Sequence, residues 1–319
     1  MTESHSYENA ILVLTIPNLE IPNHLSSSIA EATIRTRKRL IICVNSAILG
    51  NHSPTQTWYK VQSLLSFIYV QAMKEVVRLD NLLMVVDVLL HGPKESPNIP
   101  NDVEWQAIFR INGDLGTISV PGHATIVDLK PAPEADASSF PVAESKDTSH
   151  LPPSYRVVAL GGTYDHLHPG HKILLTMGTW LATEKLIVGV TVDSMLVKKN
   201  HAQVLENLDQ RLASIKAFLD LVKPNITHYL APMDDVYGPT GWDPDIQALV
   251  VSKETIAGAI AIREHRKKKD LPPLEEFVID VISSDNSNLE GEDAEFLKQS
   301  KMSSTAIREW ILRKAAEHV

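Results

Sequence analysis

The sequence GGTYDHLHPGHKILL, residues 161–175, decides how the second half of the chain folds. The apolar run 156–160 precedes it and predicts a β-strand. Residues 172–182 follow and predict a helix, because their apolar side chains recur at helical spacing. Gly161 and Gly162 allow the backbone to turn tightly and to approach a ligand closely. We therefore expect a strand, a tight turn and a helix, with a binding site at the turn.

The stretch also contains three of the chain's 13 histidines, His166, His168 and His171. Pro169 is typical of a helix start, so His171 falls in the first turn of the predicted helix. A helix N-terminus attracts phosphate through its unpaired N–H groups, and imidazole N–H groups add to such a site. A zinc site is disfavoured because neither a cysteine nor a fourth ligand lies nearby in the sequence. The stretch is not a P-loop, since no Gly-Lys-Ser/Thr follows. We predict a phosphate site and no metal ligands.

The rest of the second half alternates predicted strands and helices. The strands are residues 185–192, 227–231, 248–251 and 277–282, and the helices are residues 209–222, 255–268 and 304–316. Residues 283–293 are polar and acidic, which predicts a loop. This alternation with apolar strands predicts an α/β fold, in which a parallel sheet is covered by helices on both faces. Ligands of such sheets bind beyond the carboxyl ends of the strands.

Residues 131–153, PAPEADASSFPVAESKDTSHLPP, read as a flexible linker because they are rich in Pro, Ala, Ser and charge. They divide the chain into residues 1–130 and 154–319. The first half predicts a smaller α/β domain with strands at 10–16, 40–44 and 82–90 and a helix at 54–77. It carries no recognisable chemical motif, and no internal repeat is visible in the sequence.

The 319-residue chain has a net charge of −9, which argues against a general nucleic-acid or membrane-surface binder. Its single cysteine, Cys43, lies in an apolar run and predicts a buried side chain in a reducing compartment. The start, MTESHSYENA, lacks the apolar core of a signal peptide, and no run reaches the length of a membrane span. We expect a cytoplasmic location.

Two motifs resemble signatures of the nucleotidyltransferase superfamily. HPGH at 168–171, after GTYD at 162–165, resembles its HxGH motif. KMSSTAIR at 301–308 resembles its SSTxxR motif, which opens the last helix. The pair occurs in the expected order and on matching elements. The resemblance implies a Rossmann-like nucleotidyltransferase domain, whose members release pyrophosphate from a nucleoside triphosphate.

Further features resemble the eukaryotic phosphopantetheine adenylyltransferase family over about residues 155–311. They are DVYGP at 235–239 and VVSKET at 250–255 with the helix that follows. One departure is Gly258-Ala259, where relatives often carry two glycines. In animals the transferase domain precedes a dephospho-CoA kinase domain. No Gly-x-x-x-x-Gly-Lys-Ser/Thr occurs in this chain, so we expect the monofunctional, fungal-type form.

The resemblance implies transfer of AMP from ATP to 4′-phosphopantetheine, giving dephospho-CoA and pyrophosphate in coenzyme A biosynthesis. Mg²⁺ is expected to enter with ATP, other coenzyme A enzymes are possible partners, and neither nucleic acid nor a membrane is expected. The implied catalytic residues are His171, His168, Lys198 and Lys199, with the choice between the lysines open. The implied ATP-binding residues are Gly161, Gly162, Thr163, Tyr164, His168, Gly170, His171, Ser303, Ser304, Thr305 and Arg308. The implied acceptor-binding residues are Thr163, Asp165, Lys198, Lys199, Lys253, Glu254, Thr255 and Arg263.

Alternatives stay open at this point. Ser303 and Ser304 also suit a helix cap, as do Glu254 and Thr255. Arg211 either joins the site, faces solvent or pairs with Glu206. The two motifs do not identify the nucleophile, so a nicotinamide mononucleotide adenylyltransferase or a cytidylyltransferase is an alternative. A non-catalytic scaffold of the coenzyme A pathway is another.

Overall fold

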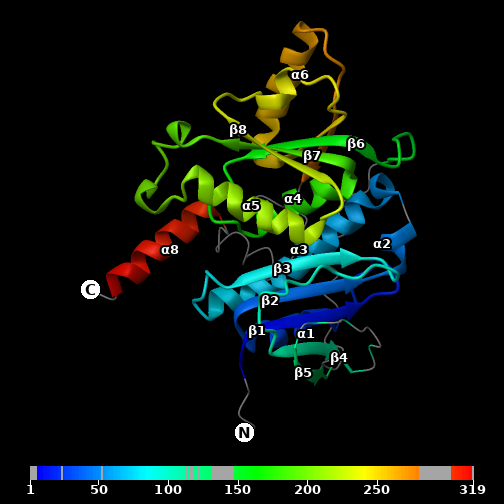
Figure 1. Ribbon diagram of the computed structural model, residues 1–319, viewed down its shortest axis with the longest axis vertical. Coiled ribbons are helices and arrows are strands. Elements are labelled where there is room, and N and C mark those ends of the chain that lie inside the picture. Colours follow the sequence, from blue (N-terminus) through cyan, green and yellow to red (C-terminus); the bar gives the residue numbers. More distant parts are fainter. Residues whose placement is uncertain are drawn as a thin grey trace. The chain divides into compact units, whose positions relative to one another are not determined.

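Figure 1 shows the computed structural model of the chain, which describes residues 6–22, 24–51, 53–112, 114, 118, 120, 122–130, 147–279 and 303–317. These residues form two compact units. One holds the residues up to 51 and those from 59 to 130, and the other holds 53–58, 147–279 and 303–317. The predicted loop 283–293 and most of the predicted linker 131–153 lie outside the described residues. The domain boundaries at 130 and 154 therefore stay a prediction.

The second unit is built on a five-stranded parallel sheet with the order β10-β9-β6-β7-β8. Its strands are β6 (Tyr155–Gly162), β7 (Ala182–Thr191), β8 (Thr227–Met233), β9 (Ala248–Ser252) and β10 (Glu275–Ile279). Its helices are α4 (Pro169–Leu181), α5 (Leu208–Val222), α6 (Ile256–Lys268) and α8 (Ser304–Glu317). Four short 3₁₀ turns, η1 (Asp193–Met195), η2 (Ala202–Val204), η3 (Gly238–Gly241) and η4 (Lys253–Thr255), lie in the connections.

The strand order reverses between β6 and β9, which fixes where the helices lie. Because crossovers between parallel strands are right-handed, α4 and α5 cover one face and α6 covers the other, as Figure 1 shows. The α/β fold with helices on both faces is thus confirmed. A Cβ at Gly178 of α4 would overlap the side chain of Leu160, so the glycine lets this helix pack closely on β6. That packing holds the start of α4 at the carboxyl end of β6.

The first unit has a second five-stranded parallel sheet, with the order β3-β2-β1-β4-β5. Its strands are β1 (Tyr7–Thr15), β2 (Thr36–Asn45), β3 (Val85–His91), β4 (Ala107–Ile111) and β5 (Thr125–Leu129), and its helices are α1 (Leu25–Ile34), α2 (Ala47–Asn51) and α3 (Pro54–Arg78). Numbered by their appearance along the chain, the strands of both units run third, second, first, fourth, fifth. The topology therefore repeats although the sequence shows no repeat.

The predicted strands and helices of the described residues are confirmed within a few residues at their ends, and four elements of the first unit, α1, α2, β4 and β5, were missed. The missed α1 contains three serines, which favour caps and turns over helix interiors. The missed β5 is a short, mostly exposed edge strand. No helix in the described parts of the chain is long and apolar enough to cross a membrane.

Candidate active site

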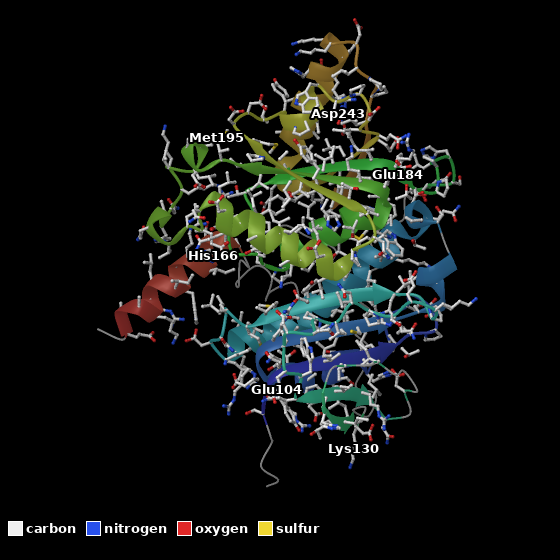
Figure 2. All side chains as sticks on the ribbon, viewed as in Figure 1. Glu104, Lys130, His166, Glu184, Met195 and Asp243 are labelled. Carbon is white, nitrogen blue, oxygen red and sulfur yellow. The ribbon has the colours of Figure 1, made fainter. Side chains whose placement is uncertain are left out.

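The loop between β6 and α4, residues 163–168, lies at the carboxyl end of the second unit's sheet. In Figure 2, Glu184 near the start of β7 and Met195 just after its end mark the two ends of this sheet, and His166 lies at the Met195 end. The backbone of Tyr164 (φ 55°) and His166 (φ 44°) is left-handed, which turns the chain sharply. The Tyr164 ring is fully buried and lies so close to Gly162 that a Cβ there would be 3.2 Å from it.

His168 and His171 are brought together at the start of α4, as the sequence predicts. His168 is the N-cap residue, and its Nδ1 accepts a hydrogen bond from the Gly170 backbone N–H at 3.2 Å. The His168 and His171 rings stack with centroids 3.9 Å apart, and Tyr164 packs beside His171 with centroids 5.2 Å apart. The two imidazoles therefore form one wall at a helix N-terminus.

Both imidazoles are neutral near pH 7. Burial lowers the pKa of His168 to about 4, and the neighbouring Lys172 and His166 act in the same direction. Burial, together with His168, also holds the pKa of His171 well below its usual value. A neutral imidazole still carries one N–H donor. The pair therefore offers hydrogen bonds to an anion without having to hold two buried positive charges.

The start of α8 forms the opposite wall. Ser303 Oγ accepts a hydrogen bond from the Ala306 backbone N–H at 3.3 Å, so Ser303 caps this helix. A cavity of about 500 Å³ lies between the starts of α4 and α8. Two helix N-termini and two imidazoles thus surround one space, which suits a ligand with several phosphates.

Most of the residues predicted for the site line this cavity. They are Gly161, Gly162, Thr163, Tyr164, His168, Gly170, His171, Lys199, Lys253, Glu254, Thr255, Ser303, Ser304, Thr305 and Arg308. Of the two candidate lysines, Lys199 is among them and Lys198 is not. Thr255 also completes the capping box of η4, since its hydroxyl accepts from the N–H of the N-cap residue Ser252 at 3.0 Å.

Besides Lys198, two more predicted acceptor-binding residues do not line this cavity. The Arg263 guanidinium makes two hydrogen bonds to the Glu276 carboxylate, at 2.8 and 2.6 Å, and lines a separate cavity of about 230 Å³ between α6 and β10. Asp165 is fully buried behind the loop and pairs with Arg308. The structure does not bring either side chain into the cavity between the two helix starts.

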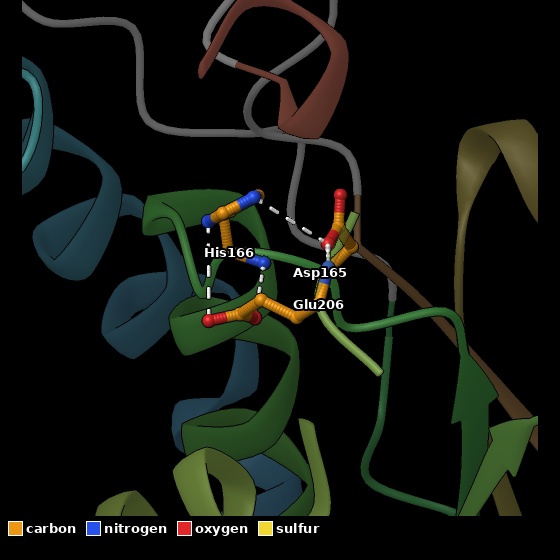
Figure 3. A group of neighbouring side chains, drawn as sticks. All are labelled: Asp165, His166 and Glu206. Atoms are coloured by element: carbon orange, nitrogen blue, oxygen red, sulfur yellow. Dashed lines mark hydrogen bonds and ion pairs between the residues drawn. The ribbon is translucent and has the colours of Figure 1, made fainter. Parts of the chain in front are cut away.

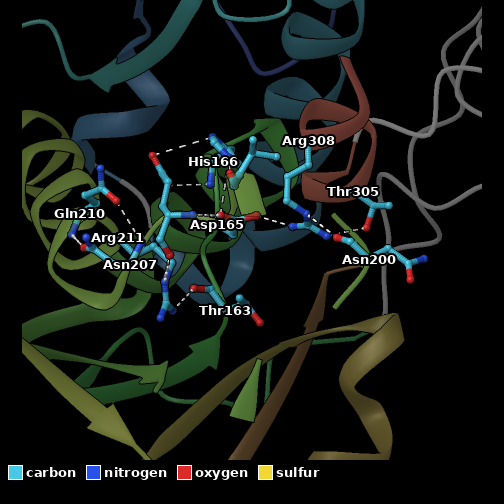
Figure 4. Close-up of polar contacts among 11 residues, drawn as sticks. Thr163, Asp165, His166, Asn200, Asn207, Gln210, Arg211, Thr305 and Arg308 are labelled. Carbon is cyan, nitrogen blue, oxygen red and sulfur yellow. Dashed lines mark hydrogen bonds and ion pairs between the residues drawn. The ribbon is translucent and has the colours of Figure 1, made fainter. Parts of the chain in front are cut away.

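A polar network behind the loop was not predicted (Figure 4). Arg211 of α5 is fully buried and donates to the backbone carbonyls of Thr163, at 2.7 Å, and of Thr191, at 2.8 Å. It also donates to the Glu206 carbonyl at 3.0 Å and to the Asp193 carboxylate at 2.6 Å. Arg211 therefore faces neither solvent nor the cavity. No sequence spacing indicates this role, because every acceptor but the Asp193 carboxylate is a backbone carbonyl.

Asp165, His166 and Glu206 bring metal-ligating atoms within 4.8 Å of one another (Figure 3). Each residue already has a protein partner. Asp165 pairs with Arg308, His166 Nε2 lies 2.8 Å from the Val204 carbonyl oxygen, and Glu206 accepts from the His166 backbone N–H at 2.8 Å. The group therefore fits a polar network that shapes the loop better than it fits a resident cation.

Known proteins resemble about half of this chain. A family model described as cytidylyltransferase-like matches residues 159–310. The phosphopantetheine adenylyltransferase of Saccharomyces cerevisiae is 40% identical over 48% of this chain and 48% of its own length, and an uncharacterized protein of Schizosaccharomyces pombe is 41% identical over 50% of this chain and 49% of its own. The chain thus matches about half the length of each. The phosphopantetheine adenylyltransferase of Pyrobaculum aerophilum is 35% identical over 40% of this chain and 81% of its own length.

Proposed function

The chain belongs to the phosphopantetheine adenylyltransferase family, and from that premise we propose that it transfers AMP from ATP to 4′-phosphopantetheine. The products are dephospho-CoA and pyrophosphate, a step of coenzyme A biosynthesis. One observation carries the proposal. The stacked imidazoles at the start of α4 and the serines at the start of α8 face a single cavity of about 500 Å³. Such a cavity is large enough for a nucleotide and part of a second substrate.

In the proposed reaction, a phosphate oxygen of 4′-phosphopantetheine attacks the α-phosphorus of ATP. The bond from that phosphorus to the bridging oxygen of the β-phosphate breaks, and pyrophosphate leaves. The attacking phosphate is already an anion near neutral pH, so the chain need not supply a general base. Catalysis then consists of positioning the two phosphates and stabilising the charge that develops between them.

The chain's own groups match those tasks. The start of α4, with His168 and His171, is placed to hold the α-phosphate and its transition state. Lys199 supplies a positive charge for both substrates, which neutral imidazoles do not. The start of α8, with Ser303 and Ser304, suits the leaving pyrophosphate.

Adenylyl transfer from ATP generally uses a divalent cation, and we propose that Mg²⁺ enters as part of the MgATP substrate. The cation neutralises part of the triphosphate charge, in addition to the charge of the lysines that line the cavity. Binding of coenzyme A enzymes and a cytoplasmic location remain predictions from the sequence.

The test is pyrophosphate release by the purified full chain with ATP and Mg²⁺. 4′-Phosphopantetheine, nicotinamide mononucleotide and phosphocholine are supplied in parallel reactions, CTP replaces ATP in a matched set, and products are identified by mass. Release only with ATP and 4′-phosphopantetheine, with dephospho-CoA formed, is the expected result. Release only with another acceptor or with CTP would contradict the substrate assignment and keep the two-helix site. No release from folded protein that still binds ATP would support the scaffold alternative.

A further inference from the structure

Arg308 joins three segments of the candidate active site (Figure 4). Its Nε donates to the backbone carbonyl of Asn200 at 2.9 Å, its Nη1 donates to the Asp165 carboxylate, and its Nη2 donates to the Thr305 hydroxyl at 3.1 Å. Asp165 belongs to the loop 163–168, which leads into α4 and is called the histidine loop. Asn200 follows Lys199 directly, and Thr305 lies in the first turn of α8. One guanidinium therefore connects the histidines, the lysine and the serines.

Both members of the ion pair are buried, Arg308 to 2% exposure and Asp165 to 0%. The second oxygen of the Asp165 carboxylate accepts the Glu206 backbone N–H at 2.9 Å. The Glu206 carboxylate in turn accepts a hydrogen bond from the His166 backbone N–H. Together the Asp165 and Glu206 carboxylates connect the loop 163–168 to the residues before α5. The pair thus lies at the centre of a network and not at its rim.

The direction of the guanidinium matters for its role. Three of the five guanidinium N–H groups, one from each nitrogen, donate to protein acceptors, so every nitrogen of the group is already held by the protein. A planar guanidinium with donors at fixed angles suits three simultaneous acceptors, which an ammonium group does not match. We call these three contacts of the Arg308 side chain, with Asn200, Asp165 and Thr305, the clamp.

We propose that Arg308 is a positioning residue for adenylyl transfer, which acts through Asp165 and Asn200 and not as a direct ligand of ATP. This inference rests on the proposed function. The clamp sets the distance between the imidazoles of α4 and the start of α8, and it places Lys199 beside them. Because the phosphates must reach both helix starts at once, small shifts between the walls reduce the rate of transfer more than they reduce binding of ATP.

The first test needs no activity. Hydrogen exchange of the ligand-free full chain is measured by mass spectrometry for peptides covering residues 163–171 and 196–206. R308M is expected to speed exchange in both peptides about tenfold, because it removes the bonds that join them. Arg156→Met is the matched control, since Arg156 makes a two-bond pair with Glu184 far along the sheet from the loop. R156M is expected to leave both peptides unchanged.

The second test is kinetic. R308M is expected to lower kcat about 100-fold with KM for ATP changed less than about threefold, because only the transition-state geometry is disturbed. D165N is expected to lower kcat about tenfold, and the D165N/R308M double variant to be no slower than R308M, since both substitutions break one unit. R308K keeps a charge beside Asp165 but lacks the fork, so it is expected to resemble R308M more than the wild type.

Two outcomes would overturn the proposal. One is hydrogen exchange that R308M leaves unchanged. The other is a kinetic result in which R308M raises KM for ATP but retains kcat, and in which the effects of D165N and R308M add. If R308M does not fold, D165N and the D165N/R308M double variant, which leaves no buried charge unpaired at this position, are compared with the wild type in the same two experiments. If the wild-type chain makes no dephospho-CoA, the proposed function fails, and the exchange experiment still decides whether Arg308 joins the segments.

Discussion

The two units share one strand order, but the loops after their first strands have different chemistry. In the second unit, residues 163–168 contain two histidines and follow two glycines. They lead into α4, whose third residue is His171. In the first unit, the corresponding loop after β1 reads IPNLEIPNH, residues 16–24, with one histidine and no glycine. Its Ile16 and Leu19 are buried in the core of that unit. The same topology is thus used once to build a cavity wall and once to extend a core.

The histidines also differ in position. His24 is the N-cap of α1 and makes no capping hydrogen bond with its side chain, whereas His168 caps α4 through Nδ1. His171 lies in the first turn of α4 and stacks on His168. A shared fold therefore does not imply a shared function, because the chemistry depends on the loop. The predictions below test how sharply the two units differ.

The largest expected effect is at His171. His171→Ala is expected to lower turnover about 10²–10⁴-fold, because it removes a donor from the site of developing charge. His24→Ala, at the helix start that follows β1 in the first unit, is the control and is expected to change turnover less than about twofold. Steady-state pyrophosphate release measures both, with circular dichroism to confirm folding. Equal losses in the two variants would show that the first unit takes part in catalysis.

The next effect separates two neighbouring lysines of the second unit. Lys199 lines the cavity and Lys198 does not. Lys199→Ala is therefore expected to lower kcat/KM about 10–100-fold, because it removes the charge that we propose contacts both substrate phosphates. Lys198→Ala is expected to stay within about threefold, as is usual for an exposed charge outside the site. The opposite order of effects would mean that the loop rearranges when ATP binds.

The strands of the second unit were predictable because most are apolar runs bounded by a turn or a helix, although β8 (THYLAPM) is less apolar than the others. The two helix starts of the site were predictable because HPGH and SST are local patterns. The position of Arg263 beside Glu276 was not predictable, since spacing along α6 does not tell which side of the helix meets β10. The Asp165–Arg308 pair joins residues 143 positions apart, and Arg211 acts on backbone carbonyls, so neither leaves a local pattern. The sequence therefore indicates the walls of the site but not what holds them together.

A third prediction concerns acid. The pKa of His168 is about 4 in the folded chain, below its value of about 6.5 when unfolded, so unfolding takes up a proton between those values. The free energy of unfolding of the second unit is therefore expected to fall as the pH drops from about 6.5 towards 4. His168→Asn keeps a capping acceptor and removes the titration, which should flatten this part of the pH profile. The free energy of unfolding at each pH is measured by urea unfolding, followed through hydrogen exchange in residues 155–191. A profile that His168→Asn leaves unchanged would assign the acid sensitivity to other groups.

The smallest effect is expected at Cys43, which reports on the first unit alone. This single cysteine lies in β2 with no exposure, and burial raises the pKa of its thiol, so a thiol reagent reacts only when that unit opens. ATP stabilises the unit that binds it, and we place its site in the second unit. Saturating MgATP is therefore expected to change the rate of Cys43 labelling less than about twofold, while it slows hydrogen exchange in α4. Labelling that slows in step with ATP concentration would show that the units are energetically coupled. The segment Ser53–Trp58 would then be the first to examine, because this start of α3 belongs to the second unit and the rest of the helix belongs to the first.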